Sequence, residues 1–427
     1  MREPAKTLTP TPLPEGEGRG RGLCQYWRMM RILLRRLAQL AGFCAGLVLL
    51  LLVALFIEHQ LPVELPKPAG PYLVGRESQV WLREPDALRT TAADRTLLAW
   101  IWYPVSPGPS ASAPAEYMPA ALRSAVDAST WLPLRILFLR DLEKVHVHSL
   151  EGTAAPANLP PFPVLVFRPG LSALSLEYST IAEDLASRGF VVVGIDAPGR
   201  SRVVVLPDGS VVRRTDANNP ENVAQEEGER IADRLVGLWS DDIAFALERL
   251  ARMDSDPGSR WRGRFDLSRI GIAGHSLGGA TAAYFCGVEP RCRAVVDIDG
   301  ALRGPVRGAV PSAPLFFLMG DHAGELARDP VARRIQGDID ALYARLPVDT
   351  RDYAQIAGAN HFQFSDGAVV RSHIAMTLLR GVGVIGLDGR RQLEITTKCV
   401  GAFFSLHLQG SADTDACSGQ PEVRMRR

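Results

Sequence analysis

The sequence predicts an α/β fold built on a mostly parallel, doubly wound sheet. From Pro163 onward, short apolar runs alternate with segments of helical periodicity. These runs are continuously apolar, which is typical of strands buried on both faces of a parallel sheet. Of the 427 residues, 46% are hydrophobic and 22% are charged, as expected for a globular protein with a sizeable core. The formal net charge of +1 gives no electrostatic reason to expect nucleic acid as a partner.

The N-terminal region differs from the rest of the chain. Its first part, "MREPAKTLTPTPLPEGEGRGRG", is rich in Pro, Gly and charge, so we expect disorder there. Leu37 to Ile57 then contains no charged residue over 21 positions, which is long enough for a transmembrane helix. The predicted organisation is a disordered segment (1–28), a membrane-spanning helix (37–58), a Pro-rich linker (59–70), an α/β domain (71–410) and a polar tail (411–427).

Basic residues crowd the N-terminal side of the apolar run: Arg28, Arg31, Arg35 and Arg36. The positive-inside rule therefore puts the N-terminus in the cytoplasm and the α/β domain on the periplasmic or extracellular side of the cell (inner) membrane. A cleaved signal peptide shares this layout and would give a secreted protein. The length of the run, and the absence of a small-x-small cleavage site in "LFIEHQLPVELPKP", favour an uncleaved single-pass anchor.

Four of the six cysteines follow the apolar run: Cys286, Cys292, Cys399 and Cys417. If that side of the membrane is oxidising, the sequence-nearest pairing joins the first two and the last two, although four cysteines allow three connectivities. No Cys/His cluster has metal-binding spacing, so we expect neither a metal nor a cofactor. His146 and His148 share one face of a short strand and lack a third ligand nearby, which favours an ordinary polar face.

The elements follow in order from local pattern. Two antiparallel edge strands (76–82, 95–105), a loop (106–115) and a helical segment (117–140) come first. Six buried strands follow, at 163–168, 190–197, 269–274, 293–300, 313–320 and 350–358. Helices are predicted at 176–189, 227–253, 277–287 and 332–346, with two more closing the chain, and a polar insertion precedes the second of them.

The stretch "RIGIAGHSLGGATAAY" holds the candidate nucleophile, Ser276. An apolar strand enters the G-x-S-x-G pattern and a small-residue helix leaves it, which is the strand-turn-helix setting of the nucleophile elbow of α/β hydrolases. Gly274 and Gly278 remove side chains that would clash in so sharp a turn. The serine hydroxyl would lie at a helix N-terminus, where the local dipole favours developing negative charge.

A nucleophilic serine needs a base, which in this fold follows an acid in chain order. His361 lies in the loop after the sixth predicted strand and is the preferred base. His373 and His407 fall inside predicted helices, and His322 follows the fifth strand, an end that usually carries the acid. His275 directly precedes the serine, so a structural role is favoured for it.

Three aspartates near strand ends compete for the acid. Asp299 ends the strand "VVDIDG" before a glycine turn and is preferred. Asp321 comes second, because it follows its strand directly, where the chain has hardly begun to turn. Asp297 shares the face of Asp299 two residues earlier and comes third.

The oxyanion hole is expected to use backbone N–H groups. One comes from Leu277, the residue after the nucleophile, and the other from the loop after the first buried strand, "FRPGLSALS". Pro169 has no N–H to give, so Leu171 is the candidate, with Gly170 letting its amide face the site.

Four motifs in order, "FRPGLSALSLEYSTIAEDLASRGFVVVGID", "GHSLGG", "VVDIDG" and "GANHFQFSD", resemble the platelet-activating factor acetylhydrolases of the plasma type and their bacterial relatives. The resemblance covers about residues 70–410 and implies the α/β-hydrolase fold. By motif match it implies Asp299 as the acid, His361 as the base, and Leu171 and Leu277 as oxyanion donors. The chain departs from the family at Arg168-Pro169, where relatives often carry Ser-His, and in the insertion "RRTDANNPENVAQEEGER".

We therefore expect a membrane-anchored, metal-independent serine esterase that acts on short or oxidised acyl esters, including phospholipids. Its partners would be a small ester or phospholipid substrate and the membrane. One alternative is a general carboxylesterase or a cutinase-like polyester hydrolase. An alternative of another class is an inactive, membrane-tethered binding protein on a hydrolase scaffold, which the apparent triad disfavours.

Overall fold

The computed structural model describes residues 18–84, 91, 95–106, 112–153, 159–411 and 415–426. The chain divides into two compact units, Met1–Ile57 and Glu58–Arg427. The described residues of the first unit belong to one long helix, α1 (Gly18–Gln60). Its segment Tyr26–Gln60 is long and apolar enough to cross a membrane, and a signal sequence near an N-terminus meets the same criterion.

Helix α1 contains the predicted span 37–58 but starts earlier. Residues 18–28, which we expected to be disordered, are helical. Residues 18–28 contain no proline, and their Arg, Leu and Gln side chains favour helix, so the helix can extend ahead of the apolar run that nucleates it despite three glycines. The rest of the predicted disordered segment, 1–17, lies outside the described residues.

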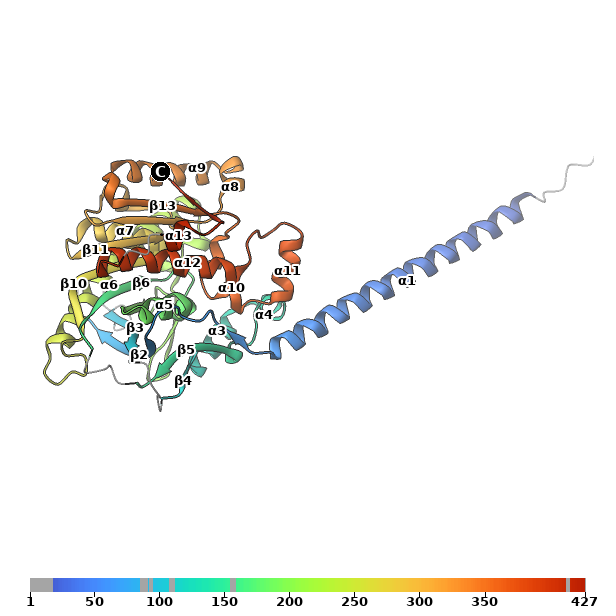
Figure 1. Cartoon of the computed structure of the whole chain (residues 1–427). Helices are drawn as coiled ribbons and strands as arrows, with labels where there is room; N and C mark the ends of the chain where they lie inside the picture. Colours follow the sequence, from blue (N-terminus) through green and yellow to red (C-terminus); the bar gives the residue numbers. More distant parts are fainter. Residues whose placement is uncertain are drawn as a thin grey trace, which may run out of the picture. The chain divides into compact units, whose positions relative to one another are not determined.

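The second unit is built on one sheet, which among the described residues has twelve strands. The order is β1-β5-β2-β3-β7-β6-β10-β11-β12-β13-β14, with β4 paired to β5 (Figure 1). From β7 to β13 all neighbours are parallel, which confirms the doubly wound prediction. The strands are β1 (Val63–Glu64), β2 (Leu73–Leu82), β3 (Thr96–Val105), β4 (Pro114–Glu116), β5 (Val145–Glu151), β6 (Phe162–Arg168), β7 (Val191–Asp196), β10 (Phe265–His275), β11 (Cys292–Ile298), β12 (Leu315–Met319), β13 (Arg351–Ile356) and β14 (Val423–Met425). A separate hairpin pairs β8 (Val203–Val205) with β9 (Val211–Arg213).

Helices cover both faces of this sheet. Helices α5 and α12 lie in front of the sheet in Figure 1, and α6 and α7 lie behind it. Along β6, Leu165 and Phe167 pack into the same core as residues of α5 and α12, whereas Val164 and Val166 pack with residues of α6, α7 and α9. The helices are α3 (Ala120–Ser129), α4 (Leu132–Phe138), α5 (Ser179–Ser187), α6 (Gln225–Ser255), α7 (Leu277–Val288), α8 (Ala323–Arg328), α9 (Pro330–Arg345), α10 (Gly367–Val370), α11 (His373–Gly381), α12 (Gly389–Phe404) and α13 (Asp415–Ser418). Short helical turns are η1 (Leu142–Lys144), η2 (Ser175–Tyr178), η3 (Asp216–Asn218), η4 (Pro220–Asn222), η5 (Gly304–Arg307), η6 (Val348–Thr350), η7 (His361–Gln363) and η8 (Ser405–Gln409).

The N-terminal strands are not at the sheet edge, which corrects the prediction. β2 and β3 pair antiparallel as expected, but β3 also bonds to β7 and every residue of it is buried. The sheet extends past β2 because β5 joins it and the predicted linker 59–70 adds Val63–Glu64 as β1 beside β5. That linker is therefore part of the domain.

Two other segments form more regular structure than predicted. The helical segment 117–140 is two helices, α3 and α4, since Pro133 can lie in the first turn of a helix but not in its interior. The predicted loop 106–115 ends in β4, while its residues 107–111 lie outside the described ones.

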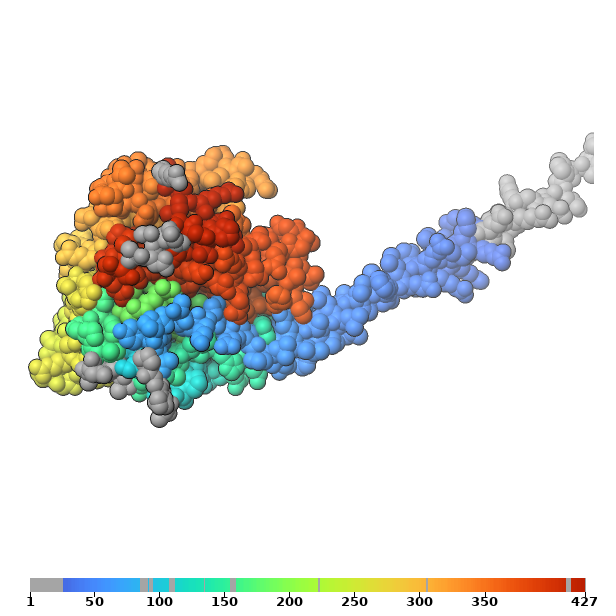
Figure 2. All heavy atoms as spheres, in the orientation of Figure 1, coloured from blue at the N-terminus to red at the C-terminus, as the bar shows by residue number. Residues whose placement is uncertain are grey.

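The predicted polar tail 411–427 also belongs to the domain. β14 pairs antiparallel with β13, and a disulfide joins Cys399 to Cys417. A second disulfide joins Cys286 to Cys292, so both sequence-nearest pairs are confirmed. Figure 2 shows the C-terminal segment, in red, on the surface of this unit. The short strand β14 is the edge strand of the sheet on the side of β13.

Candidate active site

The site begins at Ser276, which joins β10 to α7 at the carboxyl edge of the sheet. Its backbone takes φ 57° and ψ −122°, values that side chains rarely allow outside enforced turns. Among the described residues other than glycine, only Ser276 and Asp299 have a positive φ. The Ser276 N–H donates to the carbonyl oxygen of Ile298 at 2.9 Å, which ties this turn to the end of β11.

Two glycines make this turn sterically feasible. A Cβ atom at Gly278 would lie 2.2 Å from the carbonyl oxygen of Arg168, and one at Gly274 would lie 2.2 Å from the carbonyl oxygen of Gly278. Both contacts are with backbone, which cannot move aside as a flexible side chain can. The close packing of β10, α7 and the end of β6 therefore requires glycine at both positions.

The three residues selected from the sequence lie in one hydrogen-bonded row. His361 follows β13, and Asn360 caps its turn by accepting from the N–H of Phe362. The imidazole Nδ1 lies 2.7 Å from Asp299 Oδ2, and Nε2 lies 3.1 Å from Ser276 Oγ. This geometry suits proton transfer from the serine hydroxyl to an imidazole whose tautomer is fixed by a carboxylate.

Asp299 is the buried anion of this row. Burial by itself would raise its pKa, but hydrogen bonds from His322 and His361 outweigh burial and hold the pKa well below the usual range for a carboxyl group. The backbone N–H of Gly320 also donates to its Oδ1 at 2.7 Å. Asp299 is therefore held in its ionised form.

The two competing aspartates are placed differently. Asp321 accepts from the backbone N–H groups of Gly358 at 2.9 Å and Ala323 at 3.3 Å, which are turn contacts. Asp297 lies under the site, where burial, followed by the nearby charge of Asp299, raises its pKa to about 8. A carboxyl group that is neutral at pH 7 cannot stabilise an imidazolium ion as a carboxylate does.

His322, considered a weak candidate for the base, contacts the acid instead. Its Nε2 lies 2.8 Å from Asp299 Oδ1 and its Nδ1 lies 3.0 Å from Glu325 Oε2. The other two candidates lie elsewhere, His373 at the start of α11 and His407 in η8. Sequence reasoning missed the pairing of His322 with Asp299, although both residues follow the ends of neighbouring parallel strands.

A second polar chain runs behind the row. The Gly170 N–H donates to the Tyr178 hydroxyl at 3.3 Å, and that hydroxyl lies 2.8 Å from His275 Nδ1. His275 Nε2 lies 3.0 Å from the backbone oxygen of His361. Burial lowers the pKa of His275 to about 3, so its imidazole is neutral. His275 thus links the loop after β6 to the backbone of His361, a structural role as expected from the sequence.

The predicted oxyanion donors lie beside the serine. Leu171 and Leu277 both line the cavity that contains Ser276. Neither backbone N–H donates a hydrogen bond to another described residue. Leu277 begins α7, and the first N–H groups of a helix have no partner within it. Both groups are therefore available to a ligand.

Arg168, where the sequence departs from the family pattern, is buried below the site. Its guanidinium donates to the Ile195 carbonyl oxygen at 2.8 Å and lies 4.5 Å from the centre of the Trp239 ring. Burial lowers its pKa to about 10, with Asp242 and Asp196 partly opposing that shift. The residue supports the sheet and does not line either cavity beside Ser276.

No metal centre accompanies the site within the described part of the chain, where no group of three or more His, Cys, Asp or Glu side chains is arranged to hold an ion. His146 and His148 lie on β5, and the ring of His148 bonds to the carbonyl oxygen of Leu65 at 2.9 Å.

Comparison with known proteins agrees with this picture. Residues 58–233 match the model of the family "Platelet-activating factor acetylhydrolase, isoform II". A platelet-activating factor acetylhydrolase of Cavia porcellus is 24% identical over 264 residues, 58% of this chain and 58% of that protein. A protein of Arthroderma benhamiae, named "Probable 1-alkyl-2-acetylglycerophosphocholine esterase", is 24% identical over 286 residues, 61% of this chain and 65% of that protein. The chain is related to the platelet-activating factor acetylhydrolases.

The chain spans less than two thirds of the length of these acetylhydrolase relatives. The family match includes Leu171 and ends before Ser276. A ferulic acid esterase from Streptomyces cinnamoneus has a TM-score of 0.65 at 24% identity, covering 86% of this chain and 99% of that one. This likeness, with the parallel sheet and the turn at Ser276, establishes the α/β-hydrolase fold.

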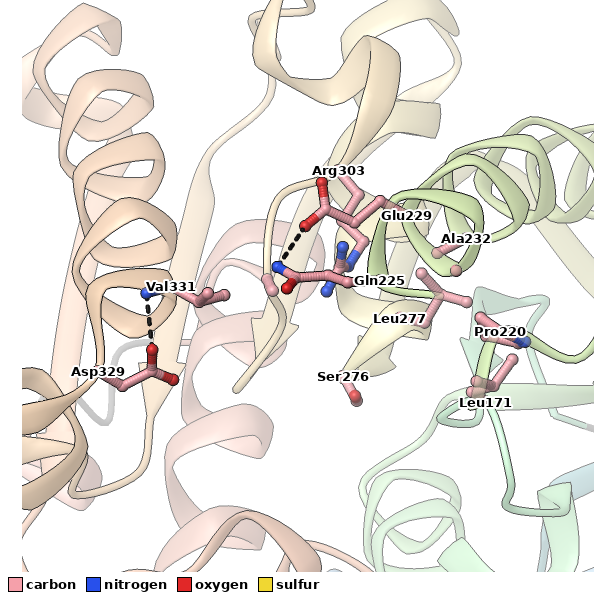
Figure 3. A pocket seen from close by; sticks show the side chains of 12 residues that line it. Leu171, Pro220, Gln225, Glu229, Ala232, Ser276, Leu277, Arg303, Asp329 and Val331 are labelled. Atoms are coloured by element: carbon pink, nitrogen blue, oxygen red, sulfur yellow. Dashed lines mark hydrogen bonds between the residues drawn. The ribbon is translucent and has the colours of Figure 1, made fainter. Parts of the chain in front are cut away.

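Two cavities meet at Ser276 and Leu171. One, of about 460 Å³, also contains Leu277, Ala232, Arg303, Glu229, Asp329 and Val331. Figure 3 shows Arg303 and Glu229 on one wall and Asp329 and Val331 across from them. The other, of about 430 Å³, lies on the side of His361 and Tyr178 and contains Tyr117, Met118, Leu142 and Val370. An ester carbonyl at Ser276 would have room for a group on each side.

Proposed function

We propose that this protein is a serine esterase that hydrolyses short-chain or oxidised acyl esters, phospholipids included, through an acyl-enzyme intermediate. The observation that carries the proposal is the row Asp299, His361 and Ser276, joined by contacts of 2.7 and 3.1 Å. A serine that is hydrogen-bonded to an oriented imidazole at a nucleophile elbow is an activated nucleophile.

In this mechanism Ser276 attacks the ester carbonyl while His361 Nε2 takes the hydroxyl proton. His361 then gives the proton to the leaving alkoxide, and the acyl group remains on Ser276 Oγ. Water repeats the sequence, with His361 as base and then as acid, and releases the carboxylic acid. Asp299 keeps Nδ1 protonated and stabilises the imidazolium ion in both halves.

The negative charge that develops on the carbonyl oxygen is stabilised by the backbone N–H groups of Leu171 and Leu277. Support comes from their position on the cavity wall beside Ser276 and their lack of acceptors among the described residues. Donors that are fixed before the reaction need no reorganisation when charge appears, and one such donor is typically worth about 3 kcal/mol in the barrier.

The substrate class is proposed from the relationship and the cavities together. The two relatives described above are named as a platelet-activating factor acetylhydrolase and a probable 1-alkyl-2-acetylglycerophosphocholine esterase. The cavity on the side of His361 combines apolar side chains with charged ones, the latter being Glu177, Arg202, Glu221 and Arg371. The cavity beyond Leu277 contains Arg303, whose cationic side chain suits a phosphate-bearing leaving group. Acetyl and other short acyl groups are compatible with either space.

We further propose that the N-terminal helix stays attached as a single-pass anchor, with the α/β domain on the periplasmic or extracellular side. Support comes from the apolar segment Tyr26–Gln60 and from the four arginines on the N-terminal side of its uncharged run, Arg28, Arg31, Arg35 and Arg36. The two disulfides suit an oxidising compartment. Membrane fractionation, with protease added outside the cytoplasmic membrane, would detect cleavage of the domain if this topology holds and protection if it does not.

The function is tested with the full-length protein in detergent against an ester panel. The panel holds a 2-acetyl phospholipid, a long-chain phospholipid, p-nitrophenyl acetate and a soluble polyester oligomer. We expect hydrolysis of the acetyl phospholipid and p-nitrophenyl acetate, with loss of both in Ser276→Ala. Preference for the polyester would instead indicate a cutinase-like hydrolase, and no turnover of any ester would indicate a binding protein.

A further inference from the structure

Asp299 is contacted by two histidines, one on each oxygen. Its Oδ2 lies 2.7 Å from His361 Nδ1, and its Oδ1 lies 2.8 Å from His322 Nε2. The side chain of Asp299 is fully buried, whereas those of His361 and His322 are 30% and 25% exposed. The mechanism above uses only His361, so the second contact needs its own explanation.

Both ring nitrogens of His322 face carboxylates. Nε2 meets Asp299 and Nδ1 meets Glu325 Oε2 at 3.0 Å. Ionised carboxylates only accept hydrogen bonds, so both nitrogens must carry a hydrogen and the ring is an imidazolium ion. The hydrogen bond to Asp299 is the largest of several effects that raise the pKa of His322 to about 9. Geometry and electrostatics therefore agree that His322 is positively charged at neutral pH.

The two histidines have different roles because their hydrogen-bond partners differ. His361 has one nitrogen on Asp299 and the other on Ser276 Oγ, so it can exchange a proton with the serine. His322 has both nitrogens occupied by acids, which leaves no lone pair for Ser276. It cannot serve as a second base, and any influence on the reaction passes through Asp299.

We infer that His322 is a positioning residue that shares the charge of Asp299 with His361 and so extends esterase activity to lower pH. This inference rests on the proposed function. If Asp299 acted on His361 alone, its full negative charge would favour the imidazolium form of His361, which cannot accept the serine proton. The positive charge of His322 offsets part of that effect, and His361 stays a free base further into the acid range.

The charged and titratable groups around this pair come from several elements. His361 faces Asp299 after β11, Ser276 after β10, and His275 through its backbone oxygen. His322 faces Asp299 and, from α8, Glu325. Asp297 on β11 and Tyr353 on β13 are titratable groups that also interact with the charge of Asp299. Asp297 and Tyr353 have raised pKa values, chiefly from burial, so both stay neutral at pH 7.

The variant that tests this inference is His322→Gln in the full-length protein. A glutamine amide can still donate to Asp299 Oδ1, so the hydrogen bond is kept while the positive charge is lost. We expect the acid limb of the kcat/KM profile for p-nitrophenyl acetate to move up by about one pH unit. At pH 9 the rate should remain within about threefold of wild type, because the glutamine keeps the hydrogen bond that orients Asp299.

Glu325→Gln is the matched control on the other side of the same ring. It keeps an acceptor for Nδ1 but removes a negative charge, so the acid limb should stay in place or move slightly down. A merely structural role of His322 would lower kcat at all pH values and leave the limb of both variants unmoved. An acid limb that does not move in active His322→Gln overturns the inference.

A readout that needs no turnover separates this inference from the function itself. Proteins with 15N-labelled histidine are titrated by NMR in the Ser276→Ala background, with His361→Gln used to assign the signal. The His361 midpoint should rise by about one pH unit on His322→Gln. An unchanged midpoint contradicts the inference even if wild type hydrolyses esters. A shifted midpoint in a protein without esterase activity supports the sharing of the Asp299 charge by the two histidines and contradicts the proposed function.

Discussion

The turns that hold Ser276 and Asp299 differ in kind from the walls of the cavities around them. At the turns, both residues have positive φ, and the side chain of Asp299 is fully buried. On the walls, Glu221 and Glu229 carry charges that are partly exposed. Each turn is restricted to one backbone conformation. The side chains on the walls can be substituted without moving the sheet. In the proposed function, the sheet edge therefore sets the chemistry and the walls select the ester.

The largest expected effect on activity comes from substituting Asp299, the proposed acid. Asp299→Asn should lower kcat by roughly 10³- to 10⁴-fold, because an amide cannot stabilise the imidazolium ion of His361 and favours the wrong tautomer. Asp321→Asn, the matched control, should stay within about tenfold of wild type, since Asp321 accepts only turn N–H groups. Steady-state hydrolysis of p-nitrophenyl acetate measures both. Loss of activity only in Asp321→Asn would show that Asp321, and not Asp299, is the acid.

The second effect concerns the packing under the serine. Gly278→Ala places a Cβ atom 2.2 Å from the carbonyl oxygen of Arg168, so the turn must shift. We expect a loss of about 3 kcal/mol or more in the free energy of unfolding, together with loss of fluorophosphonate labelling. Gly237→Ala on α6 is the control, because nothing lies within 4 Å of a Cβ there. Equal thermal midpoints for the two variants would show that the turn is not tightly constrained.

A smaller effect is expected from Asp297, which lies below both turns. Burial is the chief cause that raises the pKa of Asp297 from its ordinary value of 3.8 to about 8 in the folded protein. Folding is therefore favoured by its neutral form below pH 4, and this contribution is lost as pH rises towards 8. Asp297→Asn does not ionise, so its thermal midpoint should fall less than that of wild type between pH 5 and pH 8. If the thermal midpoints of both proteins fell equally between pH 5 and pH 8, Asp297 would not ionise in that pH range.

The smallest effect is expected on the walls. Arg303→Ala should leave kcat for p-nitrophenyl acetate within about threefold, because Arg303 lines the cavity without joining the triad. KM for a short-chain phospholipid should rise about five- to tenfold if its phosphate contacts the guanidinium. An equal change in KM for both esters would show that Arg303 shapes the cavity rather than recognising charge.

Much of the fold could be predicted because strands buried on both faces are continuous apolar runs and a long helix shows its period. The strands β6, β7, β10, β11, β12 and β13 and the helix α6 were found this way. The two-residue β1, the three-residue β14 and the hairpin β8–β9 were missed, since so few residues show no alternation. Tertiary pairing alone makes them strands.

The site could be predicted to the extent that chain order constrains it. The order of Ser276, an acid and His361 follows from the elbow and the strand ends, and these side chains do lie in one hydrogen-bonded row. The contact between His322 and Asp299 could not be read from order, because it depends on how the turn after β12 folds back towards β11. Neighbouring parallel strand ends are the signal that would have suggested it.

The most direct test of the account is to locate the nucleophile by covalent labelling. Full-length protein is treated with a fluorophosphonate probe, digested and analysed by mass spectrometry. We predict one modified site, Ser276, in wild type and none in Ser276→Ala. Modification of another residue, or ester turnover that survives Ser276→Ala, would contradict the assignment of Ser276 as the nucleophile.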